Sequence, residues 1–593
     1  MLFRTQIIVK EMQIRGQLVN IVEQKIDPVE IQVEAGKIRA INPIDTTNPA
    51  SVALVGTGGP YILPGFVDAH VHIESSLLIP SEFARMAVVH GTIATVSDPH
   101  EIANVCGLPG VEFMASDGKT QPFYFNFGAP SCVPATRFET AGATLDVAAV
   151  TQLLERQDIK YLSEMMNFPG VLHKDPEVME KIAAARRLGK PVDGHAPGLR
   201  GKEAKQYIDA GISTDHECFT KEEALEKIQQ GMHILIREGS AAKNFEALIP
   251  LLNDYPEKIM FCSDDKHPDS LLAGHIDRLC ARAVAKGIDV FKVLRAACIN
   301  PVKHYNLEHG QLKKGDPADF IIVEDLTHFR VLMTYIKGEC VAANGVTKLV
   351  STHLVSPTPA TSGGMLTASP VNNFKAEPRK KEDFFYFLDK WGEQENVEQV
   401  YCIEALDGQL ITNKLIVPIA DALPKHGQLH SNPEKDILKL VVVNRYNAAP
   451  VAKSFIKNFG LKRGAIASSV AHDSHNIVAV GVDDESLCRA VNLIIAQRGG
   501  LSCVDPGAPG DKGVQGAPAE TELILPLPVA GLMSLDDGYR VAEAYTAIDQ
   551  LAKSLGSTLG APFMTLSFMA LLVIPHLKLG DLGLFDGDKF ALV

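Results

Sequence analysis

The sequence lacks the paired cysteines that mark structural zinc sites and disulfide frameworks. Its 593 residues include ten cysteines, and no two of them form a CxxC pair. Neither a zinc ribbon nor a disulfide-stapled fold is therefore indicated. Single thiols scattered through a large chain favour a reducing compartment, so we expect a cytoplasmic protein.

Basic charge and long apolar runs are also scarce. The chain has 57 lysine and arginine residues against 71 acidic residues, a net charge of −14. This charge argues against a protein that binds the phosphate backbone of nucleic acids. No run approaches the roughly 18 apolar residues of a membrane span. The N-terminal stretch "MLFRTQIIVKEMQIRG" is interrupted by charged residues, so no signal peptide is expected. No Walker A or dinucleotide-type glycine pattern stands between a strand and a helix.

The composition that remains, 46% hydrophobic and 22% charged, is typical of globular proteins, and the length predicts three or four domains. Short β-like runs come first and are followed by alternating strand and helix patterns. A second group of β-like runs comes next, and after it a Ser/Thr/Pro-rich stretch and a second globular unit. The expected segments are 1–62 and 306–349 (a discontinuous β-sandwich domain), 63–305 (an α/β barrel), 350–383 (a linker) and 384–593 (an α+β domain).

Eight short apolar runs between residues 61 and 265 each end in polar residues and precede a helical pattern or a connection. The runs are "YILPGFVDAHVH", "GTIATVSDPH", "PFYFNFGAP", "IKYLSEMM", "KPVDGHAP", "ISTDHE", "MHILIREG" and "IMFCSDD". Continuous apolar runs are expected where parallel strands are covered on both faces. Eight strand-then-helix units over about 240 residues match the size of a (β/α)₈ barrel.

The first of these runs ends in "GFVDAHVHIESS", which places two histidines and a glutamate after a buried strand. Residues two apart on a strand point to the same side, so His70 and His72 have α-carbons about 6.6 Å apart. Two imidazoles at that separation can bind one metal at about 2.1 Å from each nitrogen. An HxH motif alone is a weak signal, since buried histidines are often satisfied by neighbouring protein groups.

Four more candidate ligands stand at the ends of other strands, on the face where barrel enzymes carry their active sites. Individually, His195 could cap a helix, Glu164 could pair with an arginine, and Asp264 could cap the helix that follows. Together they predict a six-ligand site for two metal ions, formed by His70, His72, Glu164, His195, His216 and Asp264.

With these motifs in view, the sequence resembles the amidohydrolase superfamily and, within it, the bacterial adenine deaminases. The resemblance covers nearly the whole chain. It is carried by "PGFVDAHVHIESS", "SDPHEIANVCG", "LSEMMNFPGV", "DGHAPGL", "IREGSAA", "CSDD", "VAHDSHNI" and "GLFDGDKFA". The barrel motifs are common to the superfamily, whereas "SDPHE" and "HDSHN" narrow the resemblance to the deaminases.

The resemblance implies a metal-dependent hydrolase that converts adenine to hypoxanthine and ammonia by attack of a metal-bridging hydroxide on C6, with iron(II) or manganese(II) as the active metal. Zinc also suits these ligands. Two ions would share one water and lower its pKa. His70, His72 and Asp264 would hold one ion, His195 and His216 the other, and Glu164 would bridge them. Asp264, favoured over Asp265, would also transfer the proton of the water to the departing amine.

The acid that protonates the purine ring does not follow from the superfamily pattern. Cytosine-deaminase-like relatives place a glutamate three residues after the fifth-strand histidine, and this sequence has Gly198 there. We therefore favour Glu101 as the group that contacts the purine edge, with Asp98 second; both could instead cap the following helix. The remaining candidates are His100, Arg237 and Asp265 for substrate binding, and Glu74, Ser75, His472 and His475 as supports, the last two in a turn that could also line the pocket.

Two other functions stay open. A binuclear cyclic-amide or N-acyl amidohydrolase, of dihydropyrimidinase or deacetylase type, would share the metal centre. A catalytically inactive structural homologue would usually lack a ligand, and all six are present. The zinc deaminases with a PCxxC signature are excluded because no CxxC exists. A homo-oligomer, dimer or tetramer, is expected for a metabolic enzyme, and neither nucleic acid nor membrane is expected as a partner.

Overall fold

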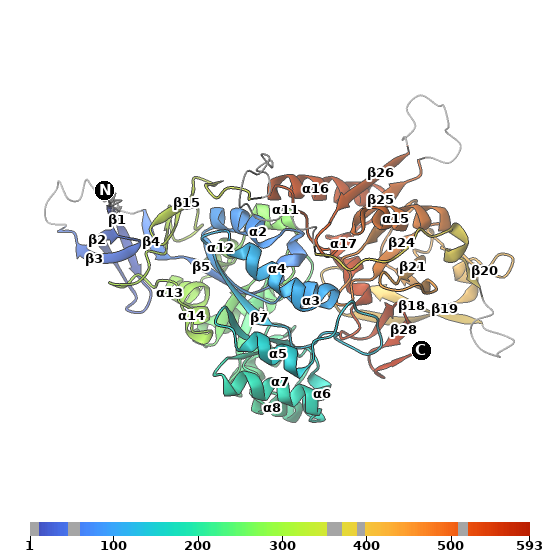
Figure 1. The fold of residues 1–593 in the computed structure, drawn as a ribbon, viewed down its shortest axis with the longest axis horizontal. Coiled ribbons are helices and arrows are strands. Elements are labelled where there is room, and N and C mark those ends of the chain that lie inside the picture. Colours follow the sequence, from blue (N-terminus) through green and yellow to red (C-terminus); the bar gives the residue numbers. More distant parts are fainter. Residues whose placement is uncertain (1–10, 46–59, 353–370, 388–397, 508–519) are drawn as a thin grey trace, which may run out of the picture.

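The computed structural model of the protein describes residues 11–45, 60–352, 371–387, 398–507 and 520–593. A small sheet, a barrel and a C-terminal domain follow one another along the long axis (Figure 1). The first ten residues of the stretch searched for a signal peptide lie outside the described residues, as does most of the expected linker. Among the described residues, no helix has both the length and the apolarity needed to cross a bilayer.

Each of the eight apolar runs contains one strand of a closed parallel barrel. Strands β5 to β9 form one hydrogen-bonded set and β10 to β12 another. The amide of Asp264 donates to the carbonyl of His70 at 2.9 Å, and that of Ser213 to Val192 at 2.9 Å, which closes the ring at both gaps. The (β/α)₈ prediction is therefore confirmed. The strands are β5 (Phe66–Val71), β6 (Thr92–Ser97), β7 (Tyr124–Ala129), β8 (Ile159–Met165), β9 (Val192–Gly194), β10 (Thr214–Asp215), β11 (His233–Arg237) and β12 (Ile259–Cys262).

Helices surround the barrel, and several begin at side chains that cap their first turn. Asp146, Asp175 and Thr220 each accept a hydrogen bond from the backbone amide three residues later, which satisfies a donor that the helix itself leaves free. The helices are α2 (Pro80–Ala87), α3 (His100–Cys106), α4 (Leu108–Gly118), α5 (Val147–Leu154), α6 (Phe168–Leu172), α7 (Pro176–Arg187), α8 (Gly201–Asp209), α9 (Lys221–Gln229), α10 (Phe245–Leu248), α11 (Pro268–Ala273), α12 (Ile276–Ala285), α13 (Val290–Leu294) and α14 (Asn300–His304).

The small domain is a single eight-stranded sheet built from two distant parts of the chain. Strand β4 runs parallel to β1 and antiparallel to β13, so it joins the two parts. The strands are β1 (Glu11–Asn20), β2 (Lys25–Glu34), β3 (Lys37–Pro43), β4 (Tyr61–Pro64), β13 (Phe320–Val323), β14 (Val331–Ile336), β15 (Glu339–Ala343) and β16 (Val346–Thr347).

The C-terminal domain has a mainly antiparallel sheet of eight strands in the order β19-β18-β22-β21-β24-β23-β25-β26. Helix α15 packs on the sheet through a separate buried cluster that includes Leu487, Val491 and Ile494. The main elements are β18 (Gln399–Ala405), β19 (Thr412–Pro418), β21 (Leu438–Val443), β22 (Ala452–Lys457), β23 (Ala465–Ser468), β24 (Ile477–Gly481), α15 (Asp484–Gln497), β25 (Gly500–Asp505), β26 (Thr521–Pro526), α16 (Gly538–Ser554), α17 (Pro562–Ser567), β27 (Leu577–Gly580), β28 (Gly583–Asp586) and β29 (Ala591–Leu592).

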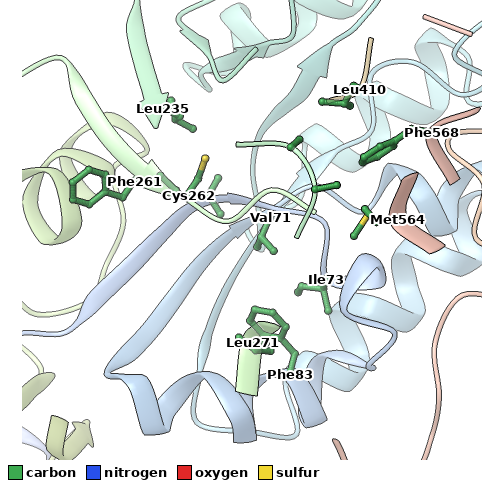
Figure 2. Packing of buried hydrophobic residues seen from close by; sticks show 14 of the residues in the cluster. Val71, Ile73, Phe83, Leu235, Phe261, Cys262, Leu271, Leu410, Met564 and Phe568 are labelled. Carbon is green, nitrogen blue, oxygen red and sulfur yellow. The ribbon is translucent and has the colours of Figure 1, made fainter. Parts of the chain in front are cut away.

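The C-terminal domain covers the ends of the barrel strands that carry the candidate ligands. Leu410, Met564 and Phe568 belong to the same buried apolar cluster as Val71, the last residue of β5, and Ile73 (Figure 2). The two domains therefore share one core. The side chains that follow the barrel strands consequently lie at a domain boundary and not at an open surface.

Candidate active site

The first group of candidate ligands joins the ends of β5 and β12. Nε2 of His72 lies 3.2 Å from Nε2 of His70 and 3.3 Å from Oδ1 of Asp264. The distance from His70 to the same carboxylate oxygen is 3.6 Å. All three residues are at most 4% exposed. Asp264 has a φ of +55°, a left-handed conformation that costs free energy and is found at functional sites.

Glu164, at the end of β8, lies between this group and a second one. Its Oε1 is 3.3 Å from Nε2 of His72. Its Oε2 is 2.8 Å from Nδ1 of His195 and 3.2 Å from Nε2 of His216. The six predicted side chains are thus brought together, with one carboxylate shared between two groups of ligand atoms.

Five of these six distances fit divalent metal ions, and the sixth, 2.8 Å between Glu164 and His195, is slightly shorter. Atoms bound at about 2.0–2.2 Å to one ion lie roughly 3.0–3.6 Å apart in octahedral or tetrahedral coordination. Nδ1 of His72 faces the backbone oxygen of Asp98 at 3.2 Å, and a proton donated there leaves Nε2 free as a ligand. Two imidazole nitrogens that face each other and one carboxylate oxygen suit a shared cation, because burying their lone pairs unpaired is unfavourable.

A buried ion pair fixes the backbone beside the second group. Nζ of Lys227 lies 2.5 Å from Oδ2 of Asp215 and donates to the carbonyl of Ala196 at 2.8 Å. Oδ1 of Asp215 accepts from the amides of Ala196 and Glu217. These residues are the chain neighbours of His195 and His216, so a single pair positions both histidines.

Arg237 lies behind the site and does not line its cavity. Its guanidinium pairs with both oxygens of Glu217 and donates to Oδ2 of Asp264 at 2.9 Å. Burial would raise the pKa of Glu217, but the charges of Arg237 and His195 outweigh it and lower that pKa to about 2. Glu217 lines the cavity and was missed in the sequence, because a glutamate directly after a strand-end histidine has no spacing signal.

The "HDSHN" loop of the C-terminal domain reaches the barrel site and meets Glu101. Nδ1 of His472 contacts one oxygen of Glu101, and Nε2 of His475 contacts the other. The charges of these histidines hold the pKa of Glu101 well below its usual range, although burial opposes them. Glu101 therefore lies inside the site as an ionised carboxylate with histidines on both oxygens.

The other predicted site residues are placed around this core. Asp98 accepts from the amides of His100 and Glu164 at 3.1 and 3.3 Å. His100 faces Asp98 with Nδ1 and Asp473 with Nε2. Supporting contacts come from Glu74, whose Oε1 accepts from the amide of Ile102, and from Ser75, which donates to Asp265 at 2.5 Å.

The cavity itself is lined by residues of both domains. The barrel provides the polar side, including Asp264, Asp265 and Glu217. The C-terminal domain provides His472 and Asp473 together with the apolar side chains of Leu410 and Leu571. The site is therefore complete only when the C-terminal domain is docked, which no local motif in the sequence could reveal.

Comparison with known proteins agrees with this geometry. The amidohydrolase family model matches residues 61–341, and the model of the adenine deaminase C-terminal domain matches residues 409–591. Adenine deaminases of Sulfurovum sp. (strain NBC37-1) and Methanosarcina mazei are 52% and 50% identical over 98% of this chain, and cover 99% and 98% of their own lengths. A β-aspartyl dipeptidase from Fervidobacterium islandicum AW-1 covers 57% of this chain and 100% of its own at 17% identity, with a TM-score of 0.42, too distant to bear on function. The chain belongs to the adenine deaminase family of amidohydrolases.

Proposed function

We propose that this protein hydrolyses adenine to hypoxanthine and ammonia. The observation that carries the proposal is the pair of ligand groups sharing Glu164 at the rim of the barrel, covered by the "HDSHN" loop of the C-terminal domain. Relatives that bear the name adenine deaminase match the chain along nearly its full length. The ten cysteines are free thiols, which is consistent with a cytoplasmic location. We also expect the protein to form a dimer or a tetramer.

The amidohydrolase family implies a divalent metal, and the ligand distances accommodate two. His70, His72 and Asp264 would hold one ion and His195 and His216 the other, with one oxygen of Glu164 on each. Nitrogen and oxygen ligands without thiolate suit iron(II) or manganese(II), with zinc also compatible. Bound divalent ions lower the pKa of a water and so supply a nucleophile at neutral pH.

Asp264 is the group placed to move a proton between the attacking water and the leaving amine. Arg237 holds its Oδ2, so Oδ1 is directed at the histidine nitrogens. A carboxylate held in this way can accept a proton from water and donate it to the amino nitrogen as the C–N bond breaks. Asp265, the next residue, lines the same cavity.

The cavity offers what a purine needs. Leu410, Leu571 and Met166 provide apolar surface for the ring faces, and His100, His472 and Asp473 provide polar groups for the ring edges. Asp98 is engaged with backbone amides, so we assign it to positioning His100 and Glu164. Arg237 acts on the substrate only through Asp264 and Glu217.

The test is a substrate panel under anaerobic conditions with manganese(II)- or iron(II)-reconstituted protein. We expect loss of adenine absorbance with one ammonia released per adenine, and no turnover by Glu164→Gln. Dihydrouracil and an N-acetylated amino sugar serve as the competing substrates. Hydrolysis of either of these in place of adenine would overturn the proposal and favour the cyclic-amide or deacetylase function. Binding of two metals without turnover of any substrate would favour the inactive homologue.

A further inference from the structure

The protonation of the "HDSHN" histidines follows from their hydrogen bonds. The amide of Ala471 donates to Nδ1 of His475 at 3.2 Å, so the proton of that ring is on Nε2. His475 therefore donates from Nε2 to one oxygen of Glu101. The other oxygen accepts from Nδ1 of His472. Glu101 thus acts as an acceptor twice, and its contact with His472 fixes a proton on Nδ1 of that ring.

This arrangement leaves Nε2 of His472 without a hydrogen-bond partner among the residues that the structure describes, although His472 is only 3% exposed. The nearest acid to Nε2 is Asp265, at 3.9 Å. His472 lines the cavity that also contains Asp264, His72 and His216. The unpartnered nitrogen therefore lies beside the space that a substrate would occupy between the two domains. Burial would lower the pKa of His472, but the charges of Glu101 and Asp265 outweigh it and raise that pKa to about 9, so the ring is cationic near neutral pH.

Deamination of adenine needs a proton at the ring nitrogen N1. As oxygen adds to C6, the C6–N1 double bond becomes single and N1 gains negative charge, which a general acid must neutralise. The position three residues after His195, Gly198, carries no acid, so the group must come from elsewhere in the site.

Four carboxylates in or beside the cavity are already engaged, and a fifth, Asp473, faces His100. Glu217 is ion-paired through both oxygens with Arg237. Asp98 accepts from two backbone amides, and Glu101 faces two histidines. Asp265 accepts from Ser75. Among the described cavity groups that are not candidate metal ligands, His472 combines a ring positioned by a carboxylate with a ring nitrogen, Nε2, that has no hydrogen-bond partner.

Resting on the proposed function, we propose that His472 of the C-terminal domain is the catalytic acid that protonates N1 of the purine, with Glu101 as the positioning residue that orients its ring. This assigns a chemical task to the C-terminal domain. It also changes the role expected for Glu101 from direct contact with the purine edge to control of His472, in the way a carboxylate orients the histidine of a catalytic dyad.

The proton balance closes with one water per adenine. The water oxygen forms the new bond to C6, and the C6–N6 bond breaks. His472 gives its Nε2 proton to N1, where it stays in hypoxanthine. Of the two water protons, one is carried by Asp264 to the amino nitrogen, which leaves as ammonia, and the other restores the proton on His472.

The test replaces His472 by Gln, and in parallel by Asn, in the full-length protein loaded with manganese(II). We expect kcat for adenine to fall by about 10²–10⁴-fold, while two metals per chain are retained. KM should change much less than kcat, because the loss is in the transition state. The wild-type decline of kcat at high pH, where His472 loses its proton, should be absent from the residual activity of both variants.

Ser474→Ala is the matched control, since Ser474 lies in the same loop and its hydroxyl contacts Asn476; its kcat should equal that of the wild type. If both His472 variants bind two metals and keep kcat within about fivefold of wild type, the assignment of the acid is wrong while adenine deamination stands. If the variants lose metal, or if kcat falls with an unchanged pH profile, the role of His472 is structural and the proposal is overturned. A wild-type protein that leaves adenine intact would instead remove the proposed function itself.

Discussion

Nη1 of the buried Arg237 donates a hydrogen bond to Oδ2 of Asp264 at 2.9 Å. The guanidinium is also paired with both oxygens of Glu217, which lies beside His195 and His216. One cation therefore connects the acid at the end of β12 with the histidines at the ends of β9 and β10. The position of Asp264, on which the proposed proton transfer depends, is set by a residue that does not line the cavity.

Replacing Arg237 by Met should strongly destabilise the protein. The change leaves Glu217 and Oδ2 of Asp264 buried without their guanidinium partner, which costs on the order of 3–5 kcal/mol in the free energy of unfolding. Urea denaturation monitored by circular dichroism measures it. The matched control is Arg282→Met, because Arg282 is 38% exposed in its ion pairs with Glu238 and Glu246, and surface pairs contribute about 1 kcal/mol or less. Equal stability of the two variants would contradict a structural role for the buried pair.

Replacing Glu164 by Gln should remove metal as well as activity. The amide keeps one neutral oxygen acceptor in place of a carboxylate that faces both ligand groups. We expect at most one metal per chain by elemental analysis and a loss of activity on the order of 10²-fold or more. Glu177→Gln should keep two metals, because the Glu177 side chain is 56% exposed in its i,i+4 pair with Lys181. Two metals in Glu164→Gln would show that this carboxylate does not bridge the ions.

Removal of the metal should lower the melting temperature. Ligands that bind only the folded state stabilise it by mass action, by about 4 kcal/mol at a metal concentration 1,000 times Kd. Without metal, the facing nitrogen atoms of His70 and His72 must be compensated by protons. Calorimetry before and after chelation, and after return of manganese(II), measures the effect. A melting temperature that does not respond to chelation would contradict the convergence of six ligands on metal.

Lys578 should make the stability of the C-terminal domain depend on pH. Its Nζ donates to the carbonyls of Leu410 and Phe568, and burial lowers its pKa to about 7, below the value near 10.4 of an unfolded chain. Between these values the unfolded chain binds more protons, so stability rises with pH.

Lys578→Met removes this group, and from pH 7 to 9 wild type should gain on the order of 2 kcal/mol relative to the variant. Urea titrations at each pH, with metal in excess, give the difference. Lys205→Met, at a surface pair with Asp209, should run parallel to wild type. If the stability of Lys578→Met also changed with pH in parallel with that of the wild type, Lys578 would be shown to stay charged in the folded protein.

The eight strands and the six candidate ligands could be read from the sequence because both depend on local pattern. An apolar run followed by His or an acid predicts a strand and its end, and the barrel then places those ends on one rim. Glu217 could not be read in this way, because nothing local distinguishes it from a surface glutamate. The meeting of Glu101 with His472 joins residues 371 positions apart, and it depends on how two domains dock, for which the sequence has no periodic signal.

The small domain shows the same limit. The β-strand character of the first 60 residues and of residues 306–349 could be predicted from the sequence. The pairing of β4 with both β1 and β13, which makes them one sheet, depends on contacts between distant parts of the chain.

The most direct test of the account is a metal titration of the metal-free protein, with adenine turnover measured at each step under anaerobic conditions. The ligand groups that share Glu164 predict that activity rises to a plateau at two equivalents of manganese(II) per chain, with one ammonia released per adenine. A plateau at one equivalent would contradict the two-metal site. Two tightly bound equivalents without loss of adenine would contradict the proposed reaction.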